Sequence, residues 1–199
     1  YKGINLAFIT PTGCSHPSLY DPSPMGWLRN WGGGLVTGCG MIGAGAPDPV
    51  EKLSLHGLLS DTPAENIVCR QEWTDGKYLL SVSGEVRESR MFGENLLLKR
   101  AISTSLGSNS FEITDSVRND GFKDSPLMLL YHINIGFPML SEDAVIKAKK
   151  HQVAPRDAEA AKGVREWNKF DAPVKGYKEQ CFYHDIPADR DGFARCTLS

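Results

Sequence analysis

The amino-acid sequence predicts an all-β protein, an antiparallel sandwich or barrel, and three observations support this prediction. Short runs with apolar residues at alternate positions dominate from about Lys77 onward, as in half-buried strands. Clusters of Gly, Asn, Asp and Ser separate these runs, as in hairpin turns. Only one segment has the composition of a helix. We therefore expect strands joined by turns to build the core.

The expected strands follow one another with turn clusters between them. Each is rich in Leu, Ile, Val, Phe, Tyr or Thr, and the runs are residues 77–89, 94–106, 109–119, 127–136, 144–150 and 179–186. The helical segment, residues 155–170, is rich in alanine and should make a short excursion over the sheet. The first seventy or so residues contain many prolines, so we expect long connections there.

The composition is that of an ordinary globular domain. Of 199 residues, 41% are hydrophobic and 23% are charged, so we expect one domain over residues 1–199. A net charge of −2 without a Lys/Arg stripe argues against nucleic acid as a partner. The longest apolar run, residues 126–131, is too short to span a membrane. The oligomeric state stays open.

The cysteines indicate a reducing compartment. There are five, without a C-x-x-C pair, and we expect reduced and mostly buried thiols in a cytoplasmic protein: Cys14, Cys39, Cys69, Cys181 and Cys196. The chain begins at Tyr1 without a methionine and stops at Ser199 inside an expected strand. We therefore expect an excerpt of a longer domain, incomplete at both ends.

A glycine-rich stretch contains the spelling of a dinucleotide-binding loop, Gly38-x-Gly40-x-x-Gly43. That motif binds a nucleotide only where a strand precedes it and a helix follows. Here Pro47 and Pro49 prevent a helix after the last glycine, and only a short run precedes the first. The sequence therefore predicts no nucleotide cofactor.

The strand expected at residues 127–136 carries the first candidate site. Alternation places His132 and Asn134 on the same face, which Met and Leu otherwise cover. A polar pair on such a face is typical of the floor of a ligand pocket. The alternative is a core histidine whose ring is hydrogen-bonded to a carbonyl. A second histidine, His56, follows Leu55 in an expected loop and is either a ligand-binding or an ordinary surface residue.

Two further segments carry candidate residues. Arg29 lies between Trp27 and Trp31, a pattern suited to stacking a sugar ring while a guanidinium holds its hydroxyls, or else to two core tryptophans and a solvated arginine. Glu179 is expected on a strand, facing away from the core. The residues 189–192 resemble part of a calcium loop, but the other ligand positions are missing, so we predict no metal.

Together these segments resemble the aldose 1-epimerase-like proteins of the galactose mutarotase superfamily, in a branch of mostly unknown function. The resemblance lies in "GWLRNWGGGLVTGCG", "LHGLLSDTPAEN", "VRESRMFGENLLLKRAISTSLGSN", "MLLYHINIGFPML" and "YKEQCFYHD", in that order. It implies a large antiparallel β-sandwich. It also implies that the partner is a small-molecule sugar whose α and β anomers are interconverted without a cofactor.

The resemblance further implies a role for each candidate. Arg29 resembles the sugar-contacting arginine, His56 the first histidine and His132 the second, which acts as the acid. Glu179 is similar to the acidic residue that binds sugar hydroxyls. The glycine-rich stretch resembles a loop of the sugar site, in which glycines let the backbone come close to the ligand. The family's general-base glutamate is expected beyond Ser199. Two alternatives stay open: a carbohydrate-binding module without catalysis, and another sugar isomerase or lyase.

Overall fold

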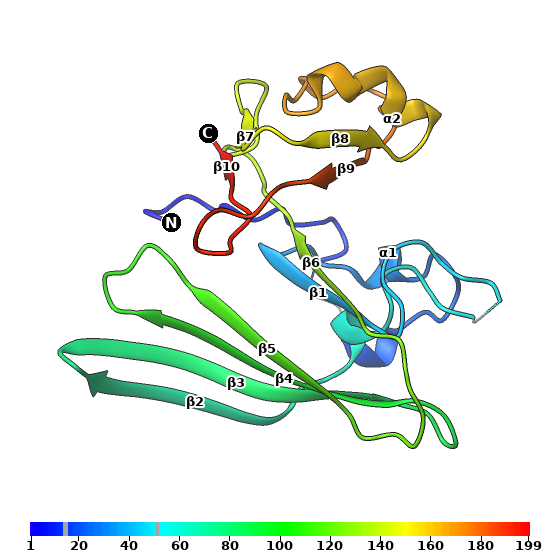
Figure 1. Ribbon diagram of the computed structural model, residues 1–199, viewed down its shortest axis with the longest axis vertical. Helices are drawn as coiled ribbons and strands as arrows, with labels where there is room; N and C mark the ends of the chain where they lie inside the picture. The colour runs from blue at the N-terminus through cyan, green and yellow to red at the C-terminus, as the bar shows by residue number, and fades with distance from the viewer. Residues whose placement is uncertain (14–15, 51) are drawn as a thin grey trace. The chain divides into compact units, whose positions relative to one another are not determined.

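The computed structural model describes residues 1–13, 16–50 and 52–199, and the chain divides into two compact units. The larger unit is residues 9–134, and the smaller one combines residues 1–8 with residues 135–199. Both units contain sheets of antiparallel strands, which are long in the larger unit and short in the smaller one (Figure 1). The prediction of an all-β fold is therefore confirmed, whereas the single domain expected over residues 1–199 stays a prediction.

The larger unit contains two antiparallel sheets. The four-stranded sheet has the order β2-β3-β4-β5, formed by Glu65–Thr74, Lys77–Ser89, Asn95–Ser105 and Glu112–Asn119. The two-stranded sheet pairs β1, Val36–Met41, with β6, Met128–Ile133. Three short helical segments precede or connect these strands: η1 (Pro17–Leu19), α1 (Trp27–Asn30) and η2 (Leu59–Asp61).

Apolar side chains from both sheets form the core of the larger unit. Met41 at the end of β1 packs with Leu96 and Leu98 of β4, all three at most 2% exposed. Leu59 of η2 joins them, and Leu129 of β6 packs against the group. Alternate residues of a strand point to the same side, so one face of β4 supplies both leucines.

A buried carboxylate joins β3 to the end of β1. Glu88 is 7% exposed, and its Oε2 accepts hydrogen bonds from the backbone N–H of Met41 at 2.6 Å and of Ile42 at 3.3 Å. Burial raises the pKa of Glu88, and these two hydrogen bonds act in the opposite direction. The carboxylate therefore satisfies backbone donors that would otherwise be buried without partners.

An ion pair links β4, β5 and β6. Arg100 donates from Nε and Nη2 to the two oxygens of Asp115 at 2.8 and 2.7 Å, and the Tyr131 hydroxyl donates to Asp115 Oδ2 at 2.6 Å. The Asp115 side chain is 4% exposed and that of Arg100 22%. Such a bidentate geometry fixes the side chains of Arg100 and Asp115, and the hydrogen bond from Tyr131 links β6 to the four-stranded sheet.

The smaller unit contains two short two-stranded sheets. β8 (Gln152–Pro155) pairs with β9 (Phe182–Asp185), and β7 (Ile146–Ala148) pairs with β10 (Cys196–Leu198). Between β8 and β9 lie α2, Ala158–Gly163, and η3, Val164–Glu166. The first residues of the chain join this unit, since the Gly136 N–H donates to the Leu6 carbonyl.

Several expectations from the sequence are wrong in detail. The helix expected at 155–170 spans only Ala158–Gly163 with η3 after it, because Pro155 belongs to β8. β1 and β2 form within the stretch expected to be loops. All ten residues of the edge strand β2 are exposed. The strand has no buried face, so its sequence need not alternate apolar and polar residues, the pattern that predicts a strand.

The thiols are less buried than expected. Among the four described cysteines, Cys39 is buried, Cys181 is half-buried, and Cys69 and Cys196 are exposed, while Cys14 lies outside the described residues. Burial raises the pKa of Cys39 to about 11. In the described part of the chain, no helix is long and apolar enough to cross a membrane.

Arg100→Ala should lower the free energy of unfolding by about 3 kcal/mol, because it leaves the buried Asp115 carboxylate without its counter-charge. The neighbouring Lys99, whose side chain is 56% exposed and pairs with Glu85 at 2.7 Å, provides a matched control. Lys99→Ala should cost less than about 1 kcal/mol. Urea unfolding of both variants measures the difference, and equal losses would contradict the structural role of the Arg100–Asp115 pair.

Candidate functional site

The rings of Trp27, Trp31 and His56 cluster around His132 in the larger unit. The rings of Trp27 and Trp31 stack with centroids 4.7 Å apart and planes 18° from parallel. The His56 ring meets the edge of Trp27 at 4.5 Å, and the His56 and His132 centroids are 5.2 Å apart. Trp31 lies 5.3 Å from His132. The two histidines thus lie well within the roughly 12 Å that one pocket could span around a single sugar.

Helix α1 sets the positions of the tryptophans and of Arg29. Trp27 and Trp31 are four residues apart, so they lie on the same side of the helix. Arg29 is two residues from each and points away from them, with a side chain that is 81% exposed and paired with Asp21 at 3.5 Å. The structure therefore shows an exposed Arg29 next to two stacked tryptophans, and its predicted contact with sugar hydroxyls stays a prediction.

The loop that carries His56 is fastened to β1 through its backbone. The Gly40 N–H donates to the His56 carbonyl at 3.1 Å, and the His56 N–H donates to the Gly45 carbonyl at 2.9 Å. Gly57 has a φ of 73°, and a Cβ there would lie 2.2 Å from the Gly43 carbonyl oxygen. Only glycine allows this approach, so the position of His56 depends on it.

The glycine-rich stretch serves strand pairing. Gly38 and Gly40 belong to β1, and a Cβ on Gly40 would lie 2.4 Å from the Met128 carbonyl oxygen of β6. The expectation of a loop whose glycines let a sugar approach is wrong for Gly40, because the close neighbour is protein backbone. Gly38 and Gly40 thus lie within a strand, and not in a turn that joins a strand to a helix.

His132 occupies β6 opposite Thr37 of β1. Its Nδ1 hydrogen-bonds Oδ1 of Asn134, and its ring also contacts Trp27 at 5.8 Å between centroids. Asn134 is 7% exposed and Trp27 is 2% exposed, so both offer little surface to a ligand. Their contacts support the imidazoles, whereas a direct role of either residue in sugar binding stays a prediction.

Glu179 belongs to the smaller unit. It precedes β9, which begins at Phe182, so the strand expected at this glutamate is not formed. Its carboxylate is 73% exposed and accepts a hydrogen bond from Arg156 Nη2 at 2.9 Å. Its predicted role in binding sugar hydroxyls stays a prediction.

Sequence patterns did not identify Ser60 and Asp61, the polar residues hydrogen-bonded in series to Trp27. The Trp27 Nε1–H donates to Ser60 Oγ at 2.9 Å, and Ser60 donates to Asp61 Oδ2 at 3.2 Å. Burial raises the pKa of Asp61. Ser60 and Asp61 lie in a segment without alternation, so only the folded chain relates them to Trp27.

The smaller unit contains a second pair of histidines, His151 and His184. His151 Nε2 and His184 Nδ1 are 2.9 Å apart, and the Trp167 ring lies 4.7 Å from His184 between centroids. Burial lowers the pKa of His184, and the charge on His151 lowers it further. Among the described residues, no group of three or more His, Cys, Asp or Glu could hold a metal ion.

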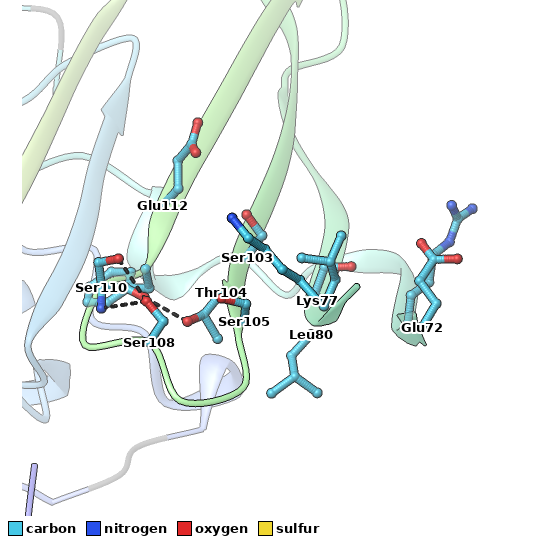
Figure 2. Close-up of a pocket in the computed structure, with 13 residues that line it drawn as sticks. Glu72, Lys77, Leu80, Ser103, Thr104, Ser105, Ser108, Ser110 and Glu112 are labelled. Atoms are coloured by element: carbon cyan, nitrogen blue, oxygen red, sulfur yellow. Dashed lines mark hydrogen bonds between the residues drawn. The ribbon is translucent and has the colours of Figure 1, made fainter. Parts of the chain in front are cut away.

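A separate hollow of about 560 Å³ lies on the four-stranded sheet. Figure 2 shows its hydroxyl side chains, and the Ser108 and Ser110 hydroxyls hydrogen-bond one another beside the β4–β5 turn. Thr104 Oγ1 donates to the Ser110 carbonyl at 2.6 Å. These hydroxyls stabilise the turn, and none of the described lining residues is a histidine. The histidine cluster is therefore the better candidate for acid–base chemistry.

Comparisons with known proteins agree with this architecture. A family model described as "Domain of unknown function (DUF4432)" matches residues 1–199. The crystal structure of a "putative aldose 1-epimerase" from Klebsiella pneumoniae subsp. pneumoniae MGH 78578 is similar, with a TM-score of 0.80 and 25% sequence identity. The match covers 90% of this chain and 49% of that one, so the chain spans about half its length. No match was found among the curated proteins. The predicted epimerase-like β-sandwich is confirmed.

Gly57→Ala should displace the His56 loop and lower the free energy of unfolding by about 2–5 kcal/mol, through the unfavourable φ and the clash with Gly43. Gly107 in the β4–β5 turn is a matched control, because its φ is 80° and a Cβ there meets nothing within 4 Å. Gly107→Ala should cost only about 1–2 kcal/mol. Urea unfolding measures both, and near-ultraviolet circular dichroism reports the tryptophan environment. An unchanged spectrum in Gly57→Ala would contradict the displacement.

Proposed function

The chain belongs to the DUF4432 family, and from its epimerase-like fold and the juxtaposition of His56 and His132 we propose that it interconverts the anomers of a free sugar. The observation that carries the proposal is the 5.2 Å separation of these two imidazoles, one on β6 and one on a loop docked against β1. An imidazole can deliver a proton or make a hydrogen bond, so such a pair suits one residue that protonates the sugar and one that hydrogen-bonds it.

The reaction requires an acid and a base acting on one sugar ring. The base removes the proton of the anomeric hydroxyl, the bond between the anomeric carbon and the ring oxygen breaks, and the acid protonates that oxygen. The open-chain aldehyde then rotates about its C–C bond and closes to the other anomer. In this proposal His132 is the acid, His56 hydrogen-bonds the ring oxygen or an adjacent hydroxyl, and the general-base glutamate that the family resemblance implies takes the proton of the anomeric hydroxyl.

The surroundings of His132 suit an acid that must stay in place. Trp27 of α1 and Trp31, the residue that follows this helix, contact its ring, and Asn134 bonds its Nδ1. A side chain held by packing and by a hydrogen bond loses little freedom on binding, which favours a productive geometry. On the strength of the family resemblance we retain Arg29 and Glu179 as residues that bind sugar hydroxyls.

His132→Ala in the full-length protein should lower the catalysed exchange by about two to four orders of magnitude, the usual contribution of a positioned acid. NMR exchange spectroscopy between α and β anomers over a panel of free sugars measures it. His16→Ala is the control, because His16 is an exposed histidine whose ring bonds Ser18 in η1. Exchange that is unchanged in His132→Ala would remove this residue from the mechanism.

The same panel distinguishes the alternatives. Saturable binding of a sugar without faster anomer exchange would indicate a carbohydrate-binding module. Formation of a ketose or of an unsaturated product would indicate another sugar isomerase or a lyase. Faster exchange with no new product supports the proposed function.

A further inference from the structure

The carboxamide of Asn134 has a defined orientation. Its Nδ2 donates to the carbonyl oxygens of Gly34 at 2.9 Å and of His132 at 2.8 Å. Carbonyl oxygens only accept hydrogen bonds, so the atom facing them must be the amide nitrogen. A rotation by 180° would set the amide oxygen against two carbonyl oxygens. The amide oxygen is therefore the atom that faces His132.

This orientation decides where the proton of the imidazole lies. Asn134 Oδ1 is an acceptor without a hydrogen, and its partner is Nδ1 of His132. Nδ1 must therefore be the donor. A neutral imidazole has a single N–H, so its Nε2 carries a lone pair, and a proton added to the ring goes to Nε2.

Thr37 of β1 and Trp31, which follows α1, further restrict the orientation of the Asn134 carboxamide. Thr37 Oγ1 lies 3.4 Å from Asn134 Nδ2, accepts a hydrogen bond from the Trp31 Nε1–H at 3.2 Å and donates to the Gly33 carbonyl at 3.4 Å. β1 pairs with β6 so that Thr37 faces His132 across the ladder. The hydrogen bonds of Asn134 are thus made within the protein, and its exposure of 7% leaves little room for a ligand.

We infer that Asn134 is a positioning residue that fixes His132 in the Nδ1–H tautomer, so that the proton delivered to the sugar ring oxygen leaves from Nε2. This inference rests on the proposed function and replaces the sugar-binding role that the sequence suggested for Asn134. In the step, the Nε2–H bond of the imidazolium breaks as an O–H bond forms at the ring oxygen. The imidazole of His132 is then neutral, and its Nδ1–H is still bonded to Asn134.

The tautomer is measurable in the full-length wild-type protein without any sugar. Long-range ¹H–¹⁵N NMR of the neutral ring, assigned by comparison with His132→Gln, should show a protonated Nδ1 and an unprotonated Nε2. Asn134→Leu should convert His132 to the Nε2–H form or to a mixture. A neutral wild-type ring protonated on Nε2 would overturn the inference, whether or not the variant folds.

Kinetics provide the second test, with the sugar that the wild type exchanges fastest. Asn134→Leu should lower kcat by about 10- to 100-fold, the usual effect of losing an orienting partner, with KM little changed. Asn109→Leu, the same substitution at an exposed position of the β4–β5 turn, should match the wild type. A raised KM at unchanged kcat would overturn the inference, since it would show that Asn134 binds the sugar.

The two proposals fail in different ways. If the wild type exchanges no sugar, the proposed function is wrong, while the NMR measurement still decides the tautomer. If exchange occurs with His132 protonated on Nε2 in its neutral form, the inference is wrong and the proposed function stands.

Discussion

The antiparallel pairing of β1 with β6 is the constraint on which the histidine cluster depends. It places Thr37 opposite His132, although the two residues lie far apart in the sequence. The same strand holds the loop of His56 through the Gly40 N–H. A side chain at Gly40 would collide with the Met128 carbonyl. Because glycine has no side chain, Gly40 can pair with β6 and also hold the His56 loop.

Buried charge stabilises this pairing from the four-stranded sheet. Glu88 accepts hydrogen bonds from the N–H groups at the end of β1. Asp115 accepts hydrogen bonds from Arg100 of β4 and from Tyr131 of β6. Each of these carboxylates has hydrogen-bond partners, as buried polar groups require. The strand that carries His132 and the strand that holds the His56 loop are therefore both attached to the four-stranded sheet, which helps the two imidazoles to keep their geometry.

Within the cluster, apolar contact and hydrogen bonding have separate effects. The stacked rings of Trp27 and Trp31 limit where the imidazoles lie, since they fill the space beside them. They do not determine which ring nitrogen holds a proton. The carboxamide of Asn134 makes that distinction, because an oxygen that only accepts needs a donor. An acid of defined geometry requires both.

The sequence by itself determined the parts of this protein that depend on local pattern. Alternation and turn residues predicted β3, β4, β5 and β6, and the period of two placed His132 and Asn134 on one face, two residues apart. The resemblance in residues 26–40 and 55–66 led to Trp27 and His56, but no pattern showed that they contact one another. Tertiary structure alone decided the rest. β2 is exposed along its length, Arg29 points away from the tryptophans, Glu179 precedes its strand, and Ser60 meets Trp27. These features follow from contacts between distant segments, and the order of residues within one segment does not contain that information.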